Sequence, residues 1–154
     1  MRKKILFVCL GNICRSPMAE GIFLDLIEKK EISNDFFVDS AGTGAYHVGE
    51  LPDNRMREIA YSHGILLTSK ARQFIKEDFN EFDYILAMDE SNFKNIIKLQ
   101  PKNPNAEVIL MRNFDQKAII DKNVPDPYYG GIDGFEEVYQ ILLRSNQKFL
   151  SSIL

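Results

Sequence analysis

Short runs of apolar residues alternate along this chain with longer segments that carry a helical pattern. The runs are expected to be strands, and they cover residues 4–9, 36–40, 84–88 and 107–110. Strands that are separated by helices pair in parallel, and a parallel sheet needs helices on both faces to bury its side chains. The alternation therefore predicts an α/β fold with a central parallel sheet.

Helix signals fill the segments between and after these strands. The first helix is expected to begin with Ser16 as its N-cap and Pro17 at its first position, because these residue types favour those places. Gly64 is expected to end the second helix, since glycine readily adopts the conformation that follows a helix. The second and later helices are expected over residues 53–63, 89–99 and 135–153.

The composition limits the kind of protein this can be. A length of 154 residues with 45% hydrophobic content fits one domain with an ordinary core, so we expect a single domain over residues 1–154. The formal net charge of −3 argues against nucleic acid as a partner. No apolar run is long enough for a membrane span or a signal peptide. A cytoplasmic protein without a membrane partner is therefore expected, and unconventional secretion would leave the same pattern.

Both cysteines of the chain, Cys9 and Cys14, lie in the turn between the first strand and the first helix. Ligands of parallel sheets bind at the carboxyl ends of strands, where this turn lies. The two histidines are distant in sequence, so no clustered set of metal ligands exists, and the cysteine spacing is not that of a Cys-x-x-Cys redox motif. Packing in a core would explain one buried cysteine. It would explain neither the Gly11-Asn12 turn nor the adjacent Arg15.

A nucleophilic cysteine explains more of this turn. A loop that leads into a helix amino terminus directs backbone N–H groups inward and forms a site for an anion. Arg15 adds a planar, permanently charged group that suits phosphate oxygens. A free cysteine has a pKa of about 8.5, and such surroundings lower cysteine pKa values to roughly 3.5–7.5. The same donors would stabilise a thiolate at Cys9 and hold a phosphate group next to it.

The residues Cys9-Leu10-Gly11-Asn12-Ile13-Cys14-Arg15-Ser16 have the Cys-x5-Arg-Ser form of cysteine-dependent phosphatases. The position of this motif near residue 1, and the later Asp126-Pro127-Tyr128-Tyr129, resemble the low-molecular-weight protein tyrosine phosphatases. The similarity extends over nearly the whole chain. It implies a three-layer sandwich in which a four-stranded parallel sheet of order 2-1-3-4 has helices on both faces, the phosphotyrosine protein phosphatase I-like fold.

The resemblance also implies a two-step mechanism without a metal or cofactor. Cys9 attacks phosphorus and forms a phosphocysteine, while Arg15 holds the phosphate group. Asp126 protonates the leaving phenolate and then activates water, and burial beside aromatic side chains and bound phosphate is expected to raise the pKa of this carboxyl group. The remaining residues of the phosphate-binding loop are Leu10, Gly11, Asn12, Ile13, Cys14 and Ser16.

Other residues are expected to support the loop or to contact the substrate. Asn12 tolerates a left-handed backbone and can tie the loop down, and the family places a serine, here Ser40, in contact with it. Cys14 is either a packing residue or, by family precedent, a partner of Cys9 in a protective disulfide. Three aromatic residues are expected to form two walls of a slot deep enough for phosphotyrosine: Tyr46, Tyr128 and Tyr129. His47 and His63 are expected to be surface or capping residues.

The expected partners are tyrosine-phosphorylated proteins, with inorganic phosphate as a product, and the protein is expected to be a monomer or a weak homodimer. Two related activities remain as alternatives. Protein-arginine phosphatases share the loop but carry threonine where Ile13 stands. Arsenate reductases of the thioredoxin-coupled kind need further cysteines, and this chain has none after Cys14. A non-catalytic phosphotyrosine-binding module would be expected to lack Cys9 or Asp126.

Overall fold

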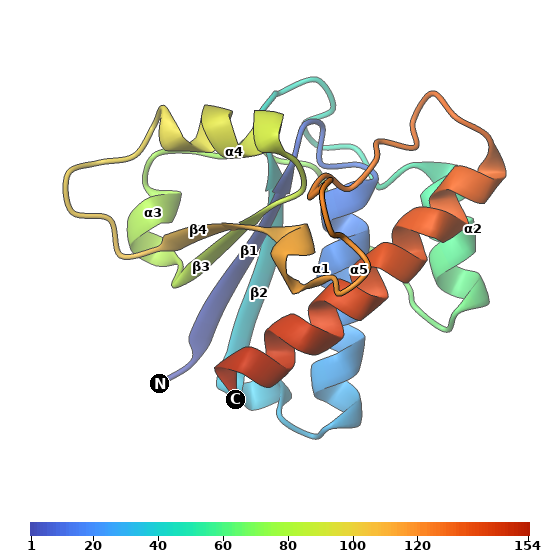
Figure 1. Ribbon diagram of the computed structural model, residues 1–154, viewed down its shortest axis with the longest axis horizontal. Helices are drawn as coiled ribbons and strands as arrows, with labels where there is room; N and C mark the ends of the chain where they lie inside the picture. Colours follow the sequence, from blue (N-terminus) through green and yellow to red (C-terminus); the bar gives the residue numbers. More distant parts are fainter.

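Four parallel strands form the centre of the molecule (Figure 1). The computed structural model describes residues 1–154. The strands lie in the spatial order β2-β1-β3-β4. Their bounds are β1 (Lys3–Cys9), β2 (Phe36–Gly42), β3 (Tyr84–Ala87) and β4 (Glu107–Leu110). The parallel pairing and the strand order confirm the fold expected from the sequence.

Helices cover both faces of this sheet. Their bounds are α1 (Arg15–Lys29), α2 (Asn54–Ser62), α3 (Asp78–Glu81), α4 (Glu90–Ile97) and α5 (Ile132–Ile153), with short 3-10 turns η1 (Ser33–Asp35) and η2 (Met111–Phe114). Helices α1, α2 and α5 pack on one face, and α3 and α4 pack on the other (Figure 1). None of the helices combines the length and the apolar character that a membrane span requires.

The central strand β1 connects two hydrophobic cores. Ile5 and Phe7 point into the larger core beneath α1 and α5, whereas Leu6 and Val8 point into the smaller core beneath α3 and α4. All four side chains are fully buried, because successive residues of a strand face opposite sides and both sides are covered. The apolar run of β1 is therefore continuous because side chains on both faces of this strand are buried.

Two details of the expected helix boundaries are wrong. Helix α1 begins at Arg15, so Ser16 and Pro17 lie inside its first turn, and Cys14 occupies the N-cap position without a side-chain hydrogen bond. Proline is tolerated there because N–H groups of a first turn have no partner within the helix. The Ser16 hydroxyl contacts Cys9 instead of capping the helix. No pattern in the sequence predicts α3, because this helix is too short to show a helical period.

The other helix ends follow the expected chemistry. Asp53 caps α2 by accepting a hydrogen bond from the Arg55 backbone N–H (2.8 Å), and Asp89 caps α4 in the same way through Asn92 (2.7 Å). Gly64 follows α2 with a φ of 80°, which confirms its predicted role as the stop.

The carboxyl ends of β1 and β2 lie in close contact at one edge of the sheet, where Cys9 pairs with Gly42. A Cβ atom added at Gly42 would lie 2.7 Å from the Leu10 carbonyl oxygen, which is shorter than a normal contact. We expect Gly42→Ala to lower the free energy of unfolding by about 1–3 kcal/mol, because backbone atoms would have to move. Urea denaturation measures this change.

Gly130→Ala is the matched control for this substitution. A Cβ atom at Gly130 would lie 3.6 Å from the nearest neighbouring atom, an ordinary van der Waals distance. Equal losses of stability in the two variants would show that the close approach of Gly42 to the loop is unimportant.

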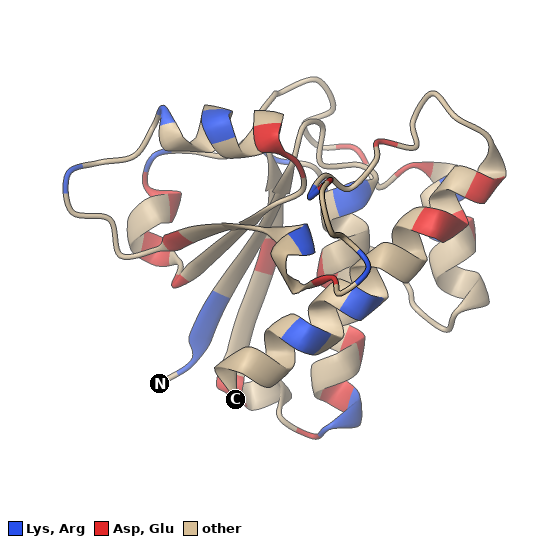
Figure 2. Cartoon of the chain, in the orientation of Figure 1, with Lys and Arg blue, Asp and Glu red and all other residues tan.

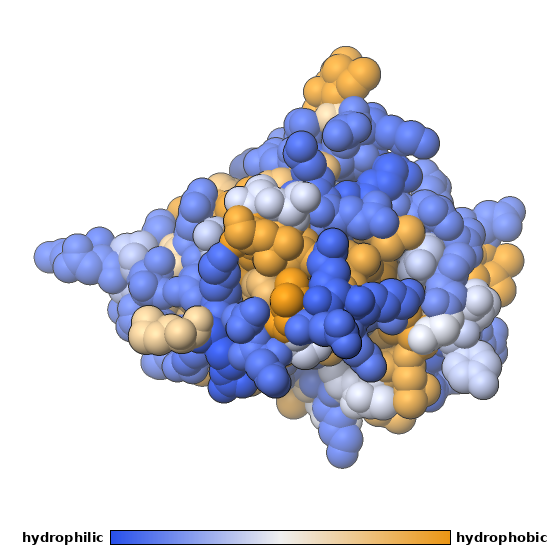
Figure 3. Space-filling view, turned by 90° about the horizontal axis from the view of Figure 1, so that it is seen from below, coloured by the Kyte–Doolittle hydropathy of each residue, from blue (hydrophilic) through white to orange (hydrophobic).

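The opposite end of the molecule, where the strands begin, is largely hydrophilic, with apolar side chains gathered near the centre of this face (Figure 3). Lysine and arginine are interspersed with aspartate and glutamate along the helices (Figure 2). The polar residues predicted for the site gather at the other end of the sheet.

Candidate active site

The loop between β1 and α1 wraps around the sulfur atom of Cys9. Asn12 has a φ of 58°, which confirms the expected left-handed backbone at this position. The turn brings the Asn12 backbone N–H to 3.3 Å from Cys9 Sγ, and the Ser16 hydroxyl lies 3.0 Å from the same atom. Cys9 is only 3% exposed. Two polar hydrogens are therefore available to this sulfur atom.

Arg15 is held rigidly at the start of α1. Its Nη1 donates hydrogen bonds to Asp89 Oδ2 (2.7 Å) and to the Val124 carbonyl oxygen (3.0 Å). Burial alone would lower the pKa of Arg15, but the charges of Cys9 and Asp89 outweigh burial and raise the pKa above its ordinary value. The guanidinium group is therefore fixed and charged at the base of the site.

The fold brings Asp126 to this site from a distant part of the chain. Its Oδ2 lies 3.7 Å from Arg15 Nη2, and its Oδ1 accepts a hydrogen bond from the Tyr128 backbone N–H (3.1 Å). The Asp126 side chain is 39% exposed, so the expected burial beside the tyrosines is wrong. The reason is that the segment between η2 and α5 lies on the surface and places this carboxylate at the rim of the site.

A cavity of about 490 Å³ opens over the Cys9 sulfur. It is lined by Cys9, Leu10, Gly11, Ile13, Cys14, Arg15, Tyr46, His47, Asp126, Tyr128 and Tyr129. All the expected wall residues contribute to it. Tyr128 and Tyr129 pack edge to face, with ring centroids 4.9 Å apart. The outer part of the cavity is therefore aromatic, while its base is polar.

The two histidines have different environments. His47 is a partly exposed residue, as expected, but it also lines the cavity, with its ring centroid 6.2 Å from that of Tyr128. His63 ends α2, stacks on Tyr139 with ring centroids 3.7 Å apart, and bonds to Glu136 of α5. His63 therefore connects two helices away from the cavity.

Cys14 differs from Cys9 although both are free thiols. Its side chain belongs to the larger hydrophobic core and is 4% exposed. Burial raises the pKa of the Cys14 thiol far above its ordinary value, and the charge of Asp53 adds to this effect. The environment of Cys14 thus keeps it in the neutral form, as a packing residue requires.

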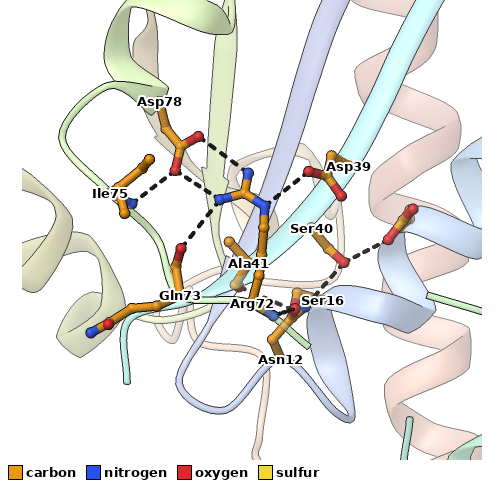
Figure 4. A network of polar contacts seen from close by, with 10 residues as sticks. Asn12, Ser16, Asp39, Ser40, Ala41, Arg72, Gln73, Ile75 and Asp78 are labelled. Carbon is orange, nitrogen blue, oxygen red and sulfur yellow. Dashed lines mark hydrogen bonds and ion pairs between the residues drawn. The ribbon is translucent and has the colours of Figure 1, made fainter. Parts of the chain in front are cut away.

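Behind the loop, polar side chains form a supporting network (Figure 4). The Asn12 amide donates to Ser16 Oγ (2.8 Å) and to Ser40 Oγ (3.0 Å), so Ser40 lies at its expected position. The Asn12 amide oxygen accepts a hydrogen bond from the Arg72 backbone N–H (3.0 Å). No group of three or more metal-ligating side chains occurs in the structure.

Comparison with known proteins identifies the family. The sequence model described as low molecular weight phosphotyrosine protein phosphatase matches residues 4–154. The chain belongs to this family. Relatives that carry the family's name include one from Schizosaccharomyces pombe, which is 47% identical over 97% of this chain and 96% of its own, and one from Mus musculus, which is 47% identical over 96% and 94%.

Solved structures agree with this membership in the low molecular weight phosphatase family. A protein tyrosine phosphatase from Entamoeba histolytica superimposes with a TM-score of 0.92 at 39% identity, covering 98% of this chain and 96% of the other. A Drosophila arginine phosphatase superimposes with a TM-score of 0.89 at 35% identity, covering 97% and 96%.

Four residues that contribute to the site of this low molecular weight phosphatase were not predicted as site residues. Asp89 holds Arg15, and His47 lines the cavity. Arg72 and Glu20 belong to the network behind the loop. Asp89 could have been suspected, because an acidic residue that follows a strand at the same sheet edge is placed to meet the Arg15 cation. The other three carry no local signal.

Proposed function

We propose that this protein hydrolyses phosphotyrosine in protein substrates through a phosphocysteine intermediate. The observation that carries the proposal is the convergence of Cys9, Arg15 and Asp126 on one cavity with an aromatic rim. The names of the relatives point to the same substrate.

In the first step, the Cys9 thiolate attacks phosphorus. The S–P bond forms while the bond between phosphorus and the tyrosyl oxygen breaks, and Asp126 donates its proton to the departing phenolate. In the second step, Asp126 accepts a proton from water as that water attacks phosphorus. The S–P bond then breaks, inorganic phosphate leaves, and the thiolate is restored.

Arg15 has the geometry that this reaction needs. Its Nη1 is occupied by Asp89 and Val124, whereas its Nη2 and Nε donate no hydrogen bond within the protein. These two groups form a fork that matches two phosphate oxygens. The charge that spreads over the equatorial oxygens during transfer would be stabilised without any reorganisation of the arginine.

The walls of the cavity support an aryl substrate. Tyr46 is 74% exposed and Tyr129 is 92% exposed, so both present their rings at the mouth. A phosphotyrosine ring would stack between such side chains while its phosphate reaches the base. A phosphoserine side chain is too short to span the same depth, and this difference favours tyrosine.

Phosphoarginine is the second candidate substrate. The similarity to a Drosophila arginine phosphatase over 97% of the chain supports it. Ile13, which lines the cavity and is 8% exposed, argues for tyrosine, because arginine phosphatases are expected to carry threonine there. The two activities therefore have to be compared directly.

The test compares three peptides of one sequence that carry phosphotyrosine, phosphoserine or phosphoarginine, with phosphate release as the measurement. We expect kcat/KM for phosphotyrosine to exceed that for phosphoserine by about 100-fold or more, because only the longer side chain fills the site. Preference for phosphoarginine would replace the proposal with the second candidate. Absence of phosphate release from all three peptides would contradict both.

A further inference from the structure

A chain of polar contacts leads from the Cys9 sulfur away from the cavity to Glu20 on α1. Cys9 Sγ lies 3.0 Å from Ser16 Oγ, which accepts from the Asn12 amide at 2.8 Å. The same amide donates to Ser40 Oγ at 3.0 Å, and Ser40 Oγ donates to Glu20 Oε1 at 2.5 Å. Figure 4 shows Asn12, Ser16 and Ser40 close together in the middle of this chain.

The orientation of the Asn12 amide is fixed by its other side. A backbone N–H can only donate, so the Arg72 N–H that bonds to Asn12 requires an oxygen there. The NH₂ group must then face the serines, and its two hydrogens go to Ser16 and Ser40.

The direction of every remaining hydrogen bond follows from this orientation. Each serine oxygen accepts from Asn12, so each hydroxyl hydrogen must go to another acceptor. The Ser40 hydrogen goes to the Glu20 carboxylate. The Ser16 hydrogen has the Cys9 sulfur at 3.0 Å and the Ala41 carbonyl oxygen at a weaker 3.4 Å. Ser16 is therefore set to donate to Cys9.

Glu20 is an unusual end for such a chain of hydrogen bonds, because no lysine or arginine side chain forms an ion pair with its carboxylate. Arg72 is bound by Asp39 (3.0 Å) and by Asp78 (3.1 Å) instead (Figure 4). Burial raises the pKa of Glu20 to about 7. The hydrogen bond from Ser40 opposes this rise. The charge of Asp39 on β2 adds to it, whereas the charge of Arg72 before α3 lowers the pKa. Glu20 thus changes its charge near neutral pH.

We propose that Glu20 is a positioning residue. Its ionised carboxylate accepts the Ser40 hydrogen and so leaves the Ser40 oxygen free to accept from Asn12, which holds Ser16 in place to donate to Cys9. The proposal rests on the proposed function, because it assigns Glu20 to the nucleophile of that reaction. A protonated Glu20 becomes a donor that competes for the Ser40 oxygen. The Asn12 amide keeps the orientation that Arg72 fixes, but its bond to Ser40 weakens. Asn12 then holds Ser16 less firmly beside Cys9.

Glu20→Gln tests this role, since glutamine has the shape of a protonated glutamate. At about pH 8 we expect kcat to fall by about threefold to tenfold with KM nearly unchanged, which is the effect of one hydrogen bond. At about pH 5.5 the two proteins should turn over at nearly the same rate, because Glu20 of the unmodified protein is then protonated. The ratio of the turnover rates of the two proteins should therefore change with pH. A ratio that is the same at about pH 8 and about pH 5.5 would overturn the proposal.

A second comparison tests whether Glu20 acts through Ser40. Ser40→Ala breaks the chain, so adding Glu20→Gln to Ser40→Ala should have no further effect. Glu28→Gln, on the exposed end of the same helix, is the control and should leave turnover unchanged. A full additional loss in the double variant would show that Glu20 acts by another route.

Stability separates positioning from a structural role. A carboxyl group with a raised pKa in the folded state destabilises that state as pH rises through the interval from its unfolded to its folded pKa, here from 4.5 to about 7. Glu20→Gln should therefore unfold at an equal or higher temperature than the unmodified protein at about pH 8, while being slower. A lower unfolding temperature would assign Glu20 a structural role and overturn the proposal.

The rate of Cys9 alkylation by iodoacetamide makes the test independent of the substrate. Glu20→Gln should change this rate at about pH 8 and not at about pH 5.5, even if no phosphopeptide is hydrolysed. Cys14 does not interfere, because its raised pKa keeps this thiol neutral and a neutral thiol is a poor nucleophile. If Glu20→Gln changes the alkylation rate at about pH 8 and not at about pH 5.5, but no peptide releases phosphate, the proposed function is rejected and the role of Glu20 stands. An alkylation rate that is unchanged at both pH values would reject the role of Glu20.

Discussion

The Cys9→Ser variant is expected to turn over aryl phosphates about 10⁴-fold more slowly, or worse, while it still folds and binds phosphate. A serine hydroxyl stays protonated at neutral pH and is a poor nucleophile, and neither the side-chain nor the backbone group that contacts the Cys9 sulfur is a carboxylate or an imidazole that could activate it. The contacts to Ser16 and to the Asn12 backbone suit a sulfur anion instead. Steady-state phosphate release measures the loss.

The neighbouring cysteine provides the matched control for this result. Cys14→Ser removes the other sulfur of the same loop, and we expect its turnover to stay within about tenfold of the unmodified protein, since it acts by packing. Rapid acid quenching should trap phosphate on the unmodified protein and on Cys14→Ser, and not on Cys9→Ser. Full turnover by Cys9→Ser would rule out the phosphocysteine mechanism.

Asp126→Ala is expected to show a loss that depends on the leaving group. With phosphotyrosine, whose phenolate departs poorly without a proton, kcat should fall by about 10²- to 10⁴-fold. With phosphate esters of strongly acidic phenols, the loss in the first step should be much smaller, because such phenolates leave unprotonated. A plot of log(kcat/KM) against phenol pKa should therefore be steeper for the variant than for the unmodified protein.

Asp133→Ala removes an exposed carboxylate from the first turn of α5, near Asp126 in sequence, and serves as the control. For Asp133→Ala, the slope of log(kcat/KM) against phenol pKa should match that of the unmodified protein. An equal loss for all leaving groups in Asp126→Ala would argue that Asp126 acts only by its charge toward Arg15, from which it lies 3.7 Å.

The sequence predicted the centre of the fold well because the signals for it are local. Each strand is a short apolar run, and the run from Ile5 to Cys9 is continuous because both of its faces are buried. Gly64 ended α2 as expected because a positive φ favours glycine. The start of α1 was predicted two residues late, because Ser16 has cap chemistry but forms its hydrogen bonds with loop atoms that only the fold places there.

The loop that we propose to carry the nucleophile could also be singled out from the sequence, since its polar residues lie within eight consecutive positions from Cys9 to Ser16. Asp126 came from resemblance alone, and the sequence could not show that its side chain is exposed. The exposure of a carboxylate depends on which other parts of the protein pack against it. The parts that lie near Asp126 are distant from it in the chain.

The sequence by itself determined the order of the strands and helices along the chain and placed Cys9 and Arg15 in one turn, because residues close in the chain set these features. Only the tertiary structure decided how Arg15 is held, where His47 lies, and how Glu20 connects to Cys9. These contacts join residues of separate elements, such as Glu20 on α1 with Ser40 on β2. Hydrogen bonds of this kind depend on distances of a few tenths of an ångström between side chains, and packing of the whole sheet and its helices fixes those distances.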